Sequence, residues 1–211
     1  MNTFLYTLLY TSIFSALIPV GMFLIKRSRG YIVTIFILAL IAFSSDAINR
    51  IMVLNGYRGF HTYNTYFILQ FLLLSYFFTQ LLFNRKLIYI ATVFYSVLYF
   101  FFILKFESFN DFQSGLRAIE NIVLLIYCAL YYRQLIATLP AQNIWQYAPF
   151  WINTAVFYYF SFNLFLFIIA NYVFKNFSSE IGMMVWGFHN INNIIKNILF
   201  AVGIYYAGKI K

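Results

Sequence analysis

The chain of 211 residues is divided into blocks of about 20 apolar residues separated by short polar connections. A helix of about 20 apolar residues is long enough to cross the ~30 Å hydrocarbon layer of a membrane. Seven such spans can be marked, at 3–25, 31–54, 63–83, 87–104, 115–136, 148–172 and 183–207. Charged residues make up only 9% of the sequence, whereas a soluble domain needs about a quarter to cover its surface. The sequence therefore predicts an all-α, multi-pass integral membrane protein, and it excludes a soluble enzyme, a disordered tail and a DNA-binding module.

The connections between these spans are short, and none is large enough to form a domain of its own. We therefore expect residues 1–211 to form a single seven-helix transmembrane domain. Pro19 lies inside the first span, where it removes a backbone hydrogen bond and predicts a kink. The one cysteine, Cys128, excludes an internal disulfide and a zinc site built from cysteines.

The net charge of +9 predicts an orientation rather than binding to nucleic acid, because the basic residues gather on one side of the spans. Cytoplasmic connections of membrane proteins carry the excess of Lys and Arg. This places the N-terminus outside and the C-terminus in the cytoplasm. The basic side carries Lys26, Arg27, Arg29, Arg85, Lys86, Arg133, Lys209 and Lys211. On the other side, Arg58, Lys105 and Lys175 are balanced by Glu107, Asp111 and Glu180.

A weak internal repeat is visible between the two halves of the chain. The pattern Phe-His-x-x-Asn occurs at 60–64 and again at 188–192. Asp46 and Asn163 lie at equal distances from Tyr31 and Ala148. The first three and last three spans could therefore be parallel copies joined by the fourth, an arrangement that some transporters use.

The most informative residues are polar ones inside the apolar spans. A charge at the centre of a membrane costs about 2.5–3.5 kcal/mol on insertion scales, so such side chains face the bundle interior and find partners. Asp46 and Arg50 are four residues apart, and Arg117 and Glu120 are three apart, so each couple can pair on one helix face. Helical rise places several of these groups about 8–14 Å below the outer edge. The members of this predicted layer are Asp46, Gln70, Glu120, Asn163 and His189.

The last span is amphipathic although it lies within the membrane. At 100° per residue, His189, Asn193 and Lys196 project to one side, and isoleucines occupy the other. We expect that polar face to line a wet or tightly hydrogen-bonded interior, with Asp46 or Glu120 as the counter-ion of Lys196.

These patterns predict a ligand site in the outer half of the bundle. Three cations within the spans face only two carboxylates, and an anionic or zwitterionic ligand, or a neutral lysine, would restore the balance. The alternative is that the polar layer only joins helices through interhelical hydrogen bonds. The candidate binding residues are Asp46, Arg50, Gln70, Arg117, Glu120, Asn163, His189, Asn193 and Lys196; no catalytic or metal-ligating set is predicted.

Several stretches of the chain resemble a group of small, uncharacterised seven-helix bacterial inner-membrane proteins that often occur near sensor histidine kinases. The resemblance implies a bacterial inner-membrane location and favours signalling; Gln70 stands where an acid would be expected. The stretches that carry it are Glu120, Pro149-Phe150-Trp151-Ile152, Tyr159-Phe160-Ser161-x-Asn163-Leu164-Phe165 and His189-Asn190-x-x-Asn193-Ile194-x-x-Asn197-Ile198-Leu199.

Two other seven-helix groups share features with the chain. The length and the repeat are similar to those of PQ-loop sugar transporters and the KDEL receptor, but their adjacent Pro-Gln is absent. Lys196 in the last span is similar to the lysine of retinal Schiff-base proteins. Their preceding acid is Asn192 here, so we expect no retinal on Lys196 and no other cofactor.

The sequence thus favours a receptor or sensor-accessory protein that binds a small anionic or zwitterionic ligand. Its expected partners are the lipid bilayer and a membrane sensor kinase or other membrane subunit, not nucleic acid. A small-solute or proton-coupled transporter is the first alternative, and an intramembrane enzyme using His189 with Asp46 or Glu120 is the second.

Overall fold

The computed structural model describes residues 2–27, 29–57, 59–105, 112–140 and 143–207. Within these ranges the chain is all-helical and contains no strand. The helices are α1 (Asn2–Ser15), α2 (Leu17–Lys26), α3 (Tyr31–Leu54), α4 (Phe60–Leu81), α5 (Arg85–Lys105), α6 (Ser114–Thr138), the short 3₁₀ helix η1 (Ile144–Gln146), α7 (Ala148–Asn176) and α8 (Ser179–Ala207).

The predicted spans correspond to these helices one by one, with α1 and α2 together forming the first. Five stretches of the described chain are long and apolar enough to cross a membrane: Thr3–Lys26, Tyr31–Leu54, Arg85–Lys105, Ser114–Thr138 and Ala148–Asn176. Helices α4 and α8 have sufficient length but carry more polar side chains. Their polar residues lie largely inside the bundle, where Gln70 and Lys196 are both buried.

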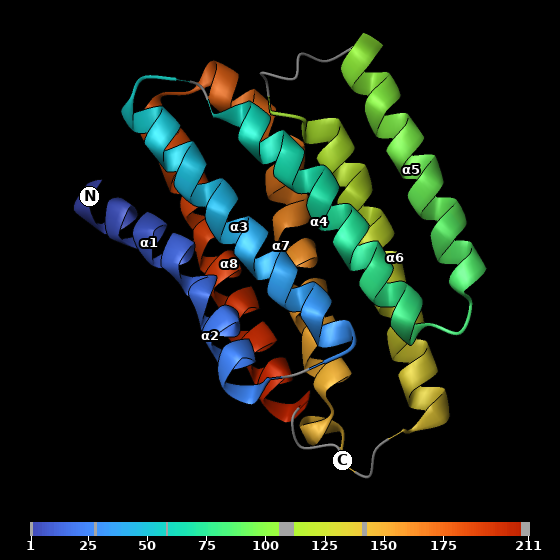
Figure 1. The fold of residues 1–211 in the computed structure, drawn as a ribbon. Coiled ribbons are helices and arrows are strands. Elements are labelled where there is room, and N and C mark those ends of the chain that lie inside the picture. The colour runs from blue at the N-terminus through green and yellow to red at the C-terminus, as the bar shows by residue number, and fades with distance from the viewer. Residues whose placement is uncertain (1, 28, 58, 106–111, 141–142, 208–211) are drawn as a thin grey trace.

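The kink predicted from Pro19 is present, one turn before the proline. Helix α1 ends at Ser15 and α2 begins at Leu17, and the intervening Ala16 is completely buried. Because Pro19 has no N–H, the carbonyl of Ser15 lacks its usual helical donor. The first span is therefore two helical segments that point in different directions (Figure 1).

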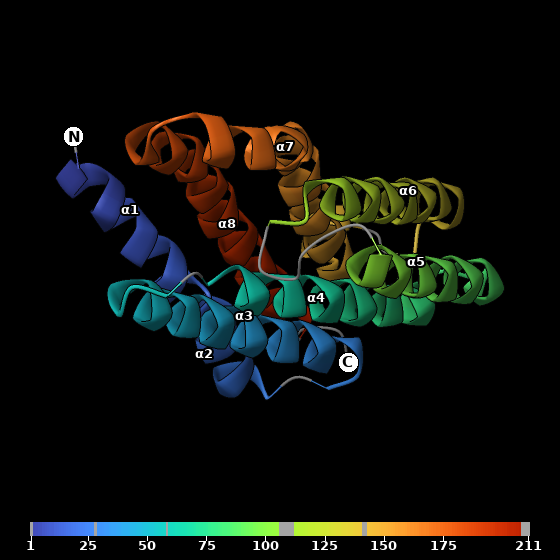
Figure 2. The same ribbon diagram turned by 90° about the horizontal axis from the view of Figure 1, so that it is seen from above.

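The helices run alternately up and down, and α8 lies between the first span and α7 (Figures 1 and 2). The upper end of α1 diverges from the bundle when it is viewed from above (Figure 2). Helix α5 packs on α4 and α6 at the edge of the bundle. The first three and the last three predicted spans thus lie on either side of α5 in the chain. The internal repeat proposed between them stays a prediction.

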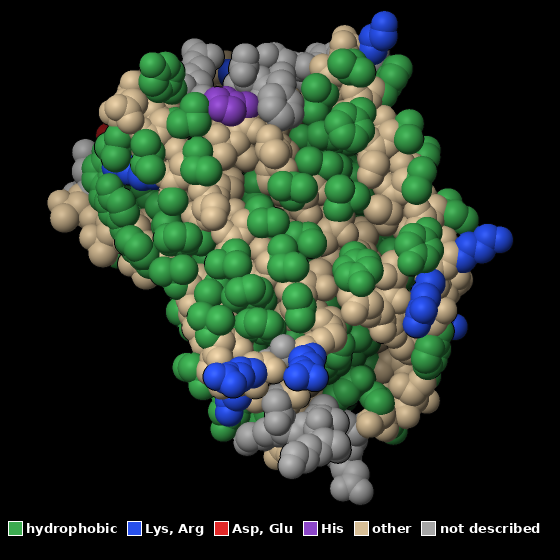
Figure 3. Space-filling model, in the orientation of Figure 1, with side chains coloured by type: hydrophobic (Ala, Val, Ile, Leu, Met, Phe, Trp, Pro, Cys, Tyr) green, Lys and Arg blue, Asp and Glu red, His purple; other side chains and the backbone are tan. Residues whose placement is uncertain are grey.

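The outer surface is apolar, as expected of a protein surrounded by lipid. Helix α5 exposes a row that includes Ile90, Phe94, Val97 and Leu104, and hydrophobic side chains cover much of the face in Figure 3. The described Lys and Arg residues of the predicted basic side lie at or near helix ends: Lys26 and Arg27 at the end of α2, Arg29 before α3, Arg85 and Lys86 at the start of α5, and Arg133 near the end of α6. Five of the charges used to predict the orientation lie outside the described residues: Arg58, Glu107, Asp111, Lys209 and Lys211. Which end faces the cytoplasm stays a prediction.

Helices α7 and α8 approach closely at Gly203. A Cβ atom built there would lie 2.7 Å from Cγ1 of Ile152 and 3.3 Å from the carbonyl oxygen of Ala148. Because neither the backbone of α7 nor the branched part of Ile152 moves freely, a larger residue would separate the two helices.

We predict that Gly203→Ala lowers the free energy of unfolding by about 1–3 kcal/mol, because overpacking a tight helix contact strains both helices. The matched control is Gly21→Ala in α2, where no atom lies within 4 Å of the added Cβ. This control should be neutral or stabilising by up to ~1 kcal/mol, because alanine favours helix. Thermal unfolding of the purified variants in detergent measures both effects; equal melting of the two variants would show that the contact is not tight.

Candidate functional site

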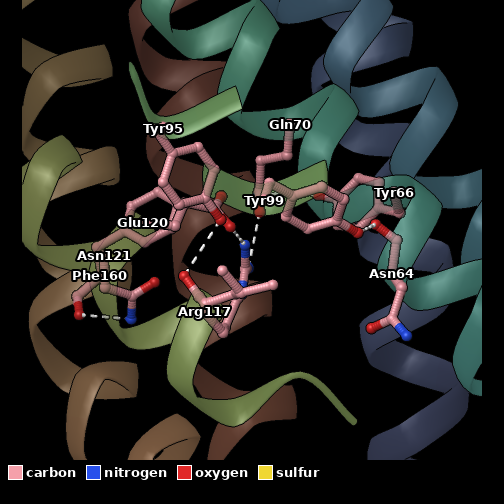
Figure 4. A network of polar contacts seen from close by, with 10 residues as sticks. Asn64, Tyr66, Gln70, Tyr95, Tyr99, Arg117, Glu120, Asn121 and Phe160 are labelled. Carbon is pink, nitrogen blue, oxygen red and sulfur yellow. Dashed lines mark hydrogen bonds and ion pairs between the residues drawn. The ribbon is translucent and has the colours of Figure 1, made fainter. Parts of the chain in front are cut away.

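An ion pair sealed inside the bundle forms the first polar cluster, on α6 and α4. Nη1 of Arg117 lies 2.6 Å from Oε2 of Glu120, and neither side chain is exposed. Nη2 of Arg117 donates a 2.7 Å hydrogen bond to Oε1 of Gln70, whose Nε2 donates to the Tyr66 hydroxyl at 2.9 Å (Figure 4). The pairing predicted from the three-residue spacing is therefore confirmed.

Aromatic rings surround the guanidinium of Arg117. Its central carbon lies 3.9 Å from the centroid of the Phe67 ring and 4.7 Å from that of Phe167. Cation–π contacts of this kind stabilise a desolvated arginine. Nε of Arg117 and Oε1 of Glu120 nevertheless have no hydrogen-bond partner in the described part of the chain. The cluster therefore depends on the two opposite charges staying together.

The second cluster joins α7 to α8 around Asn163. Its Oδ1 lies 3.3 Å from Nδ1 of His189 and 3.5 Å from Nδ2 of Asn192, which donates to it. The Tyr158 hydroxyl donates to Oδ1 of Asn192 at 3.1 Å. His189 also stacks near Trp186, with 4.5 Å between ring centroids. Asn163 and His189, predicted from separate spans, thus contact each other.

The rest of the polar face of α8 is directed at the kinked first span. Nδ2 of Asn193 donates to Oγ of Ser12 at 3.0 Å, and Nδ2 of Asn197 donates to Oγ of Ser15 at 2.8 Å. These two bonds hold the last turn of α1, just before the kink at Ala16. Because both amides are buried, their hydrogen bonds fix the first span to α8 at this depth.

Lys196 is buried between these groups and has no ion-pair partner within 4.0 Å in the described chain. Its Nζ lies 4.4 Å from the centroid of the Tyr159 ring. Of the two carboxylates predicted as its counter-ion, Glu120 pairs with Arg117 instead, and Asp46 forms no ion pair with Lys196 within 4.0 Å. Within the described chain, the face of the Tyr159 ring therefore takes the place of a direct salt bridge.

Two cavities lie next to these clusters, and Asp46 lines both. The smaller one, of about 10 Å³, has room for about one water molecule. It is bordered by Tyr66 from the first cluster and by His189 and Asn193 from α8. The two clusters and Asp46 thus meet around one small hollow.

The larger cavity has a volume of about 830 Å³ and is open to the exterior. It lies at the end of the bundle where α1 diverges, between α1, α3 and the adjoining ends of α7 and α8. Most of its wall is apolar, with Trp186, Phe60 and Leu9 among the lining residues. Its polar residues are Tyr6, Asp46, Asn49, Arg50, Tyr63, Asn171, Lys175, Ser178, Ser179 and Asn190.

The ion pair predicted between Asp46 and Arg50 is wrong. The guanidinium of Arg50 instead donates two hydrogen bonds to the Tyr10 hydroxyl, from Nε at 3.2 Å and from Nη2 at 3.1 Å. It also lies over the Tyr6 and Tyr10 rings. Sequence spacing identifies neighbours on one helix, but here a residue of α1 competes for the arginine. In the described chain, Asp46 consequently has neither a hydrogen bond nor an ion pair.

The structure therefore divides the nine predicted residues into three groups. Gln70, Arg117 and Glu120 form the sealed cluster; Asn163, His189, Asn193 and Lys196 belong to the α7–α8 interior; only Asp46 and Arg50 line the large cavity.

Several lining residues were missed, including Trp186, Lys175 and Tyr6. Trp186 could have been found, because it is three residues before His189 and seven before Asn193 on the same face of α8. Lys175 and Tyr6 could not, because only the three-dimensional arrangement brings these helix ends together.

In the described residues, no three or more His, Cys, Asp or Glu side chains gather where they could hold a metal ion. No protein family, curated protein or solved structure matches the chain. The resemblances noted from sequence motifs therefore stay predictions, and the geometry alone supports a function.

We predict that Arg117→Met lowers the free energy of unfolding by about 3–5 kcal/mol, because it leaves the Glu120 carboxylate buried without a counter-charge. The double variant Arg117→Met/Glu120→Leu should recover much of that loss, since no charge then stays unpaired. Denaturant titration of the purified proteins, followed by circular dichroism, measures the coupling. Additive effects of the two substitutions would contradict an obligatory pair.

Proposed function

We propose that this protein is a membrane receptor or sensor-accessory protein, and that its ligand is a small zwitterionic or anionic molecule bound in the large cavity. The observation that carries the proposal is the position of Asp46. Its carboxylate faces the 830 Å³ cavity without a partner in the described chain. A carboxylate in such a place is expected to bind a cationic or hydrogen-bond-donating group.

The cavity has the general properties of a ligand site. Pockets for small molecules typically have volumes of about 300–1,000 Å³, with mostly apolar walls and a few converging polar groups. Arg50 and Lys175 add two positive charges to the one negative charge of Asp46. A molecule with one anionic and one cationic group, or a simple anion, complements that set.

The polar side chains deeper in the bundle than Asp46 favour a binding protein over a transporter. A transporter needs a polar path toward the other end of the bundle. Here Asn193 and Asn197 are already hydrogen-bonded to Ser12 and Ser15. These bonds attach α8 to the kinked span, so a ligand that moves α1 would also act on α8. Such a coupling suits a receptor that passes a helix movement to a partner subunit.

The proposed setting is the bacterial inner membrane, with the cavity toward the outside and a membrane sensor kinase or other membrane subunit as partner. The long apolar helices support a membrane location. The location of the basic residues supports the orientation under the positive-inside rule.

We expect phosphoethanolamine and glycerol phosphate, used as water-soluble zwitterionic and anionic probes, to raise the melting temperature of the purified protein. Asp46→Asn should weaken the apparent affinity for phosphoethanolamine about tenfold, because it removes one charge-assisted contact. Glu180→Gln is the matched control, since this carboxylate is exposed and does not line the cavity.

Dose–response curves for both probes give the comparison. If neither probe changes the melting temperature, or if both variants respond alike, the assignment of Asp46 to a ligand site is wrong. Uptake of radiolabelled phosphoethanolamine into proteoliposomes, abolished by Asp46→Asn, would favour the transporter alternative over the receptor.

A further inference from the structure

We propose that the large cavity receives a phospholipid with a primary-amine headgroup from the surrounding membrane, through the side between α1 and α3. This inference rests on the proposed function, because it takes the cavity as the ligand site, and it names the class of ligand. Three features carry it: the way in which α1 and α3 are joined, the order of charges in the cavity, and its apolar wall.

Near the cavity, helices α1 and α3 are joined by contacts between long side chains. The Arg50 guanidinium reaches across to Tyr10 and lies 5.5 Å from the centroid of the Tyr6 ring. Further along, the Phe14 and Phe43 rings meet at 6.2 Å. Such side chains can change rotamer without movement of either backbone.

Helix α1 is held instead by α8, on its other side. A Cβ atom built at Gly187 of α8 would lie 3.4 Å from Cδ2 of Leu5 and 3.7 Å from Cδ2 of Leu8. The Asn193–Ser12 bond continues this contact toward the kink. The side between α1 and α3 is thus the one that can open while α1 stays attached. In a protein whose flanks are apolar, that side faces lipid.

The charges lie in an order that matches an ethanolamine headgroup. Asp46 is one helical turn further into the bundle than Arg50, a separation of about 6 Å along α3. Lys175 lines the cavity from the end of α7. A phosphate bound by Arg50 would have its amine one turn deeper, beside the Asp46 carboxylate, and Lys175 adds positive charge to the same cavity. A quaternary ammonium cannot donate a hydrogen bond, and a glycerol headgroup has no positive charge, so both match the carboxylate less well.

The apolar wall accounts for the rest of the cavity. Leu5, Leu9 and Ile13 of α1 line it on one side, and Val53 and Met183 contribute from α3 and α8. A soluble headgroup leaves these side chains without a partner, whereas the upper parts of two acyl chains would cover them. Burial of apolar surface stabilises such a complex by about 25 cal/mol per Å². The cavity therefore fits an amphiphile better than a wholly polar solute.

Trp186 lines the cavity, while Trp145 and Trp151 lie at the opposite end of α7, which makes a selective fluorescence test available. The variant Trp145→Phe/Trp151→Phe keeps Trp186 as its only tryptophan. This variant is reconstituted into phosphatidylcholine vesicles that contain phospholipids brominated on both acyl chains. The brominated lipid carries an ethanolamine, choline or glycerol headgroup. Bromine quenches tryptophan fluorescence only at short range, so quenching reports which lipid lies beside Trp186.

We expect brominated phosphatidylethanolamine to quench Trp186 at about tenfold lower mole fraction than the other two lipids, as for the gain of one charge-assisted hydrogen bond. Asp46→Asn in the same background should remove the preference. Trp186→Phe, which keeps Trp145 and Trp151, is the control and should show no headgroup preference.

Equal quenching by all three headgroups would overturn the inference. If soluble phosphoethanolamine still raised the melting temperature through Asp46, the proposed function would stand with a free zwitterion as ligand. If neither that response nor the headgroup preference were found, both proposals would fail together. A preference that persists in Asp46→Asn would also overturn the inference, because the amine would then be recognised elsewhere.

Discussion

Polar side chains inside this bundle must find their partners within the protein, because the outer surface is apolar and supplies none. Most of them do so across helices. Arg117 is held by Glu120 and Gln70 and enclosed by aromatic rings. Asn193 and Asn197 are bonded to the serines that precede the kink. This requirement sets the positions of α4, α6 and α8 and of the first span, and it makes any partly buried polar group without a partner conspicuous.

Asp46 is such a group, and its surroundings follow from the course of the first span. Pro19 interrupts the backbone hydrogen bonds of that span, so that α1 diverges from the bundle while Ser12 stays bound to α8. The divergence opens the 830 Å³ cavity. Arg50 then donates its hydrogen bonds to Tyr10 of α1 and forms no ion pair with Asp46. The bend at Pro19 thus accounts both for the volume of the cavity and for the unpaired carboxylate of Asp46 in its wall.

Sequence patterns predicted the parts of this arrangement that depend on one helix at a time. Apolar length gave the bounds of α3 to the residue, and the spacing of Arg117 and Glu120 gave their ion pair. The same spacing argument failed for Asp46 and Arg50, because a tyrosine from another helix supplied a competing partner. Helical periodicity predicted that Asn193 and Lys196 face the interior, but not that serines of α1 would receive the asparagines.

The cavity itself could not be predicted, because its wall comes from helix ends that are distant in sequence. Lys175 was taken only as a charge of a connection, yet it lines the cavity together with residues of α1 and α3. The periodicity of α7 alone gives no indication that Lys175 lies near residues of α1 and α3. The residues predicted to share one polar layer are divided between a sealed ion pair, the α7–α8 interior and an accessible carboxylate. Their common depth in a membrane stays a prediction, and the difference in burial between Glu120 and Asp46 could not be inferred from depth.

The outer end of α1 diverges from the bundle and leaves Asp46 beside an accessible cavity. A density map of the protein in nanodiscs made from a native lipid extract is the decisive measurement. We expect elongated non-protein density between α1 and α3 that contacts Asp46, Arg50 and Trp186. A map in which α1 packs along the whole length of α3, Asp46 pairs with Arg50 and no space is left between them would show that the proposed site does not exist.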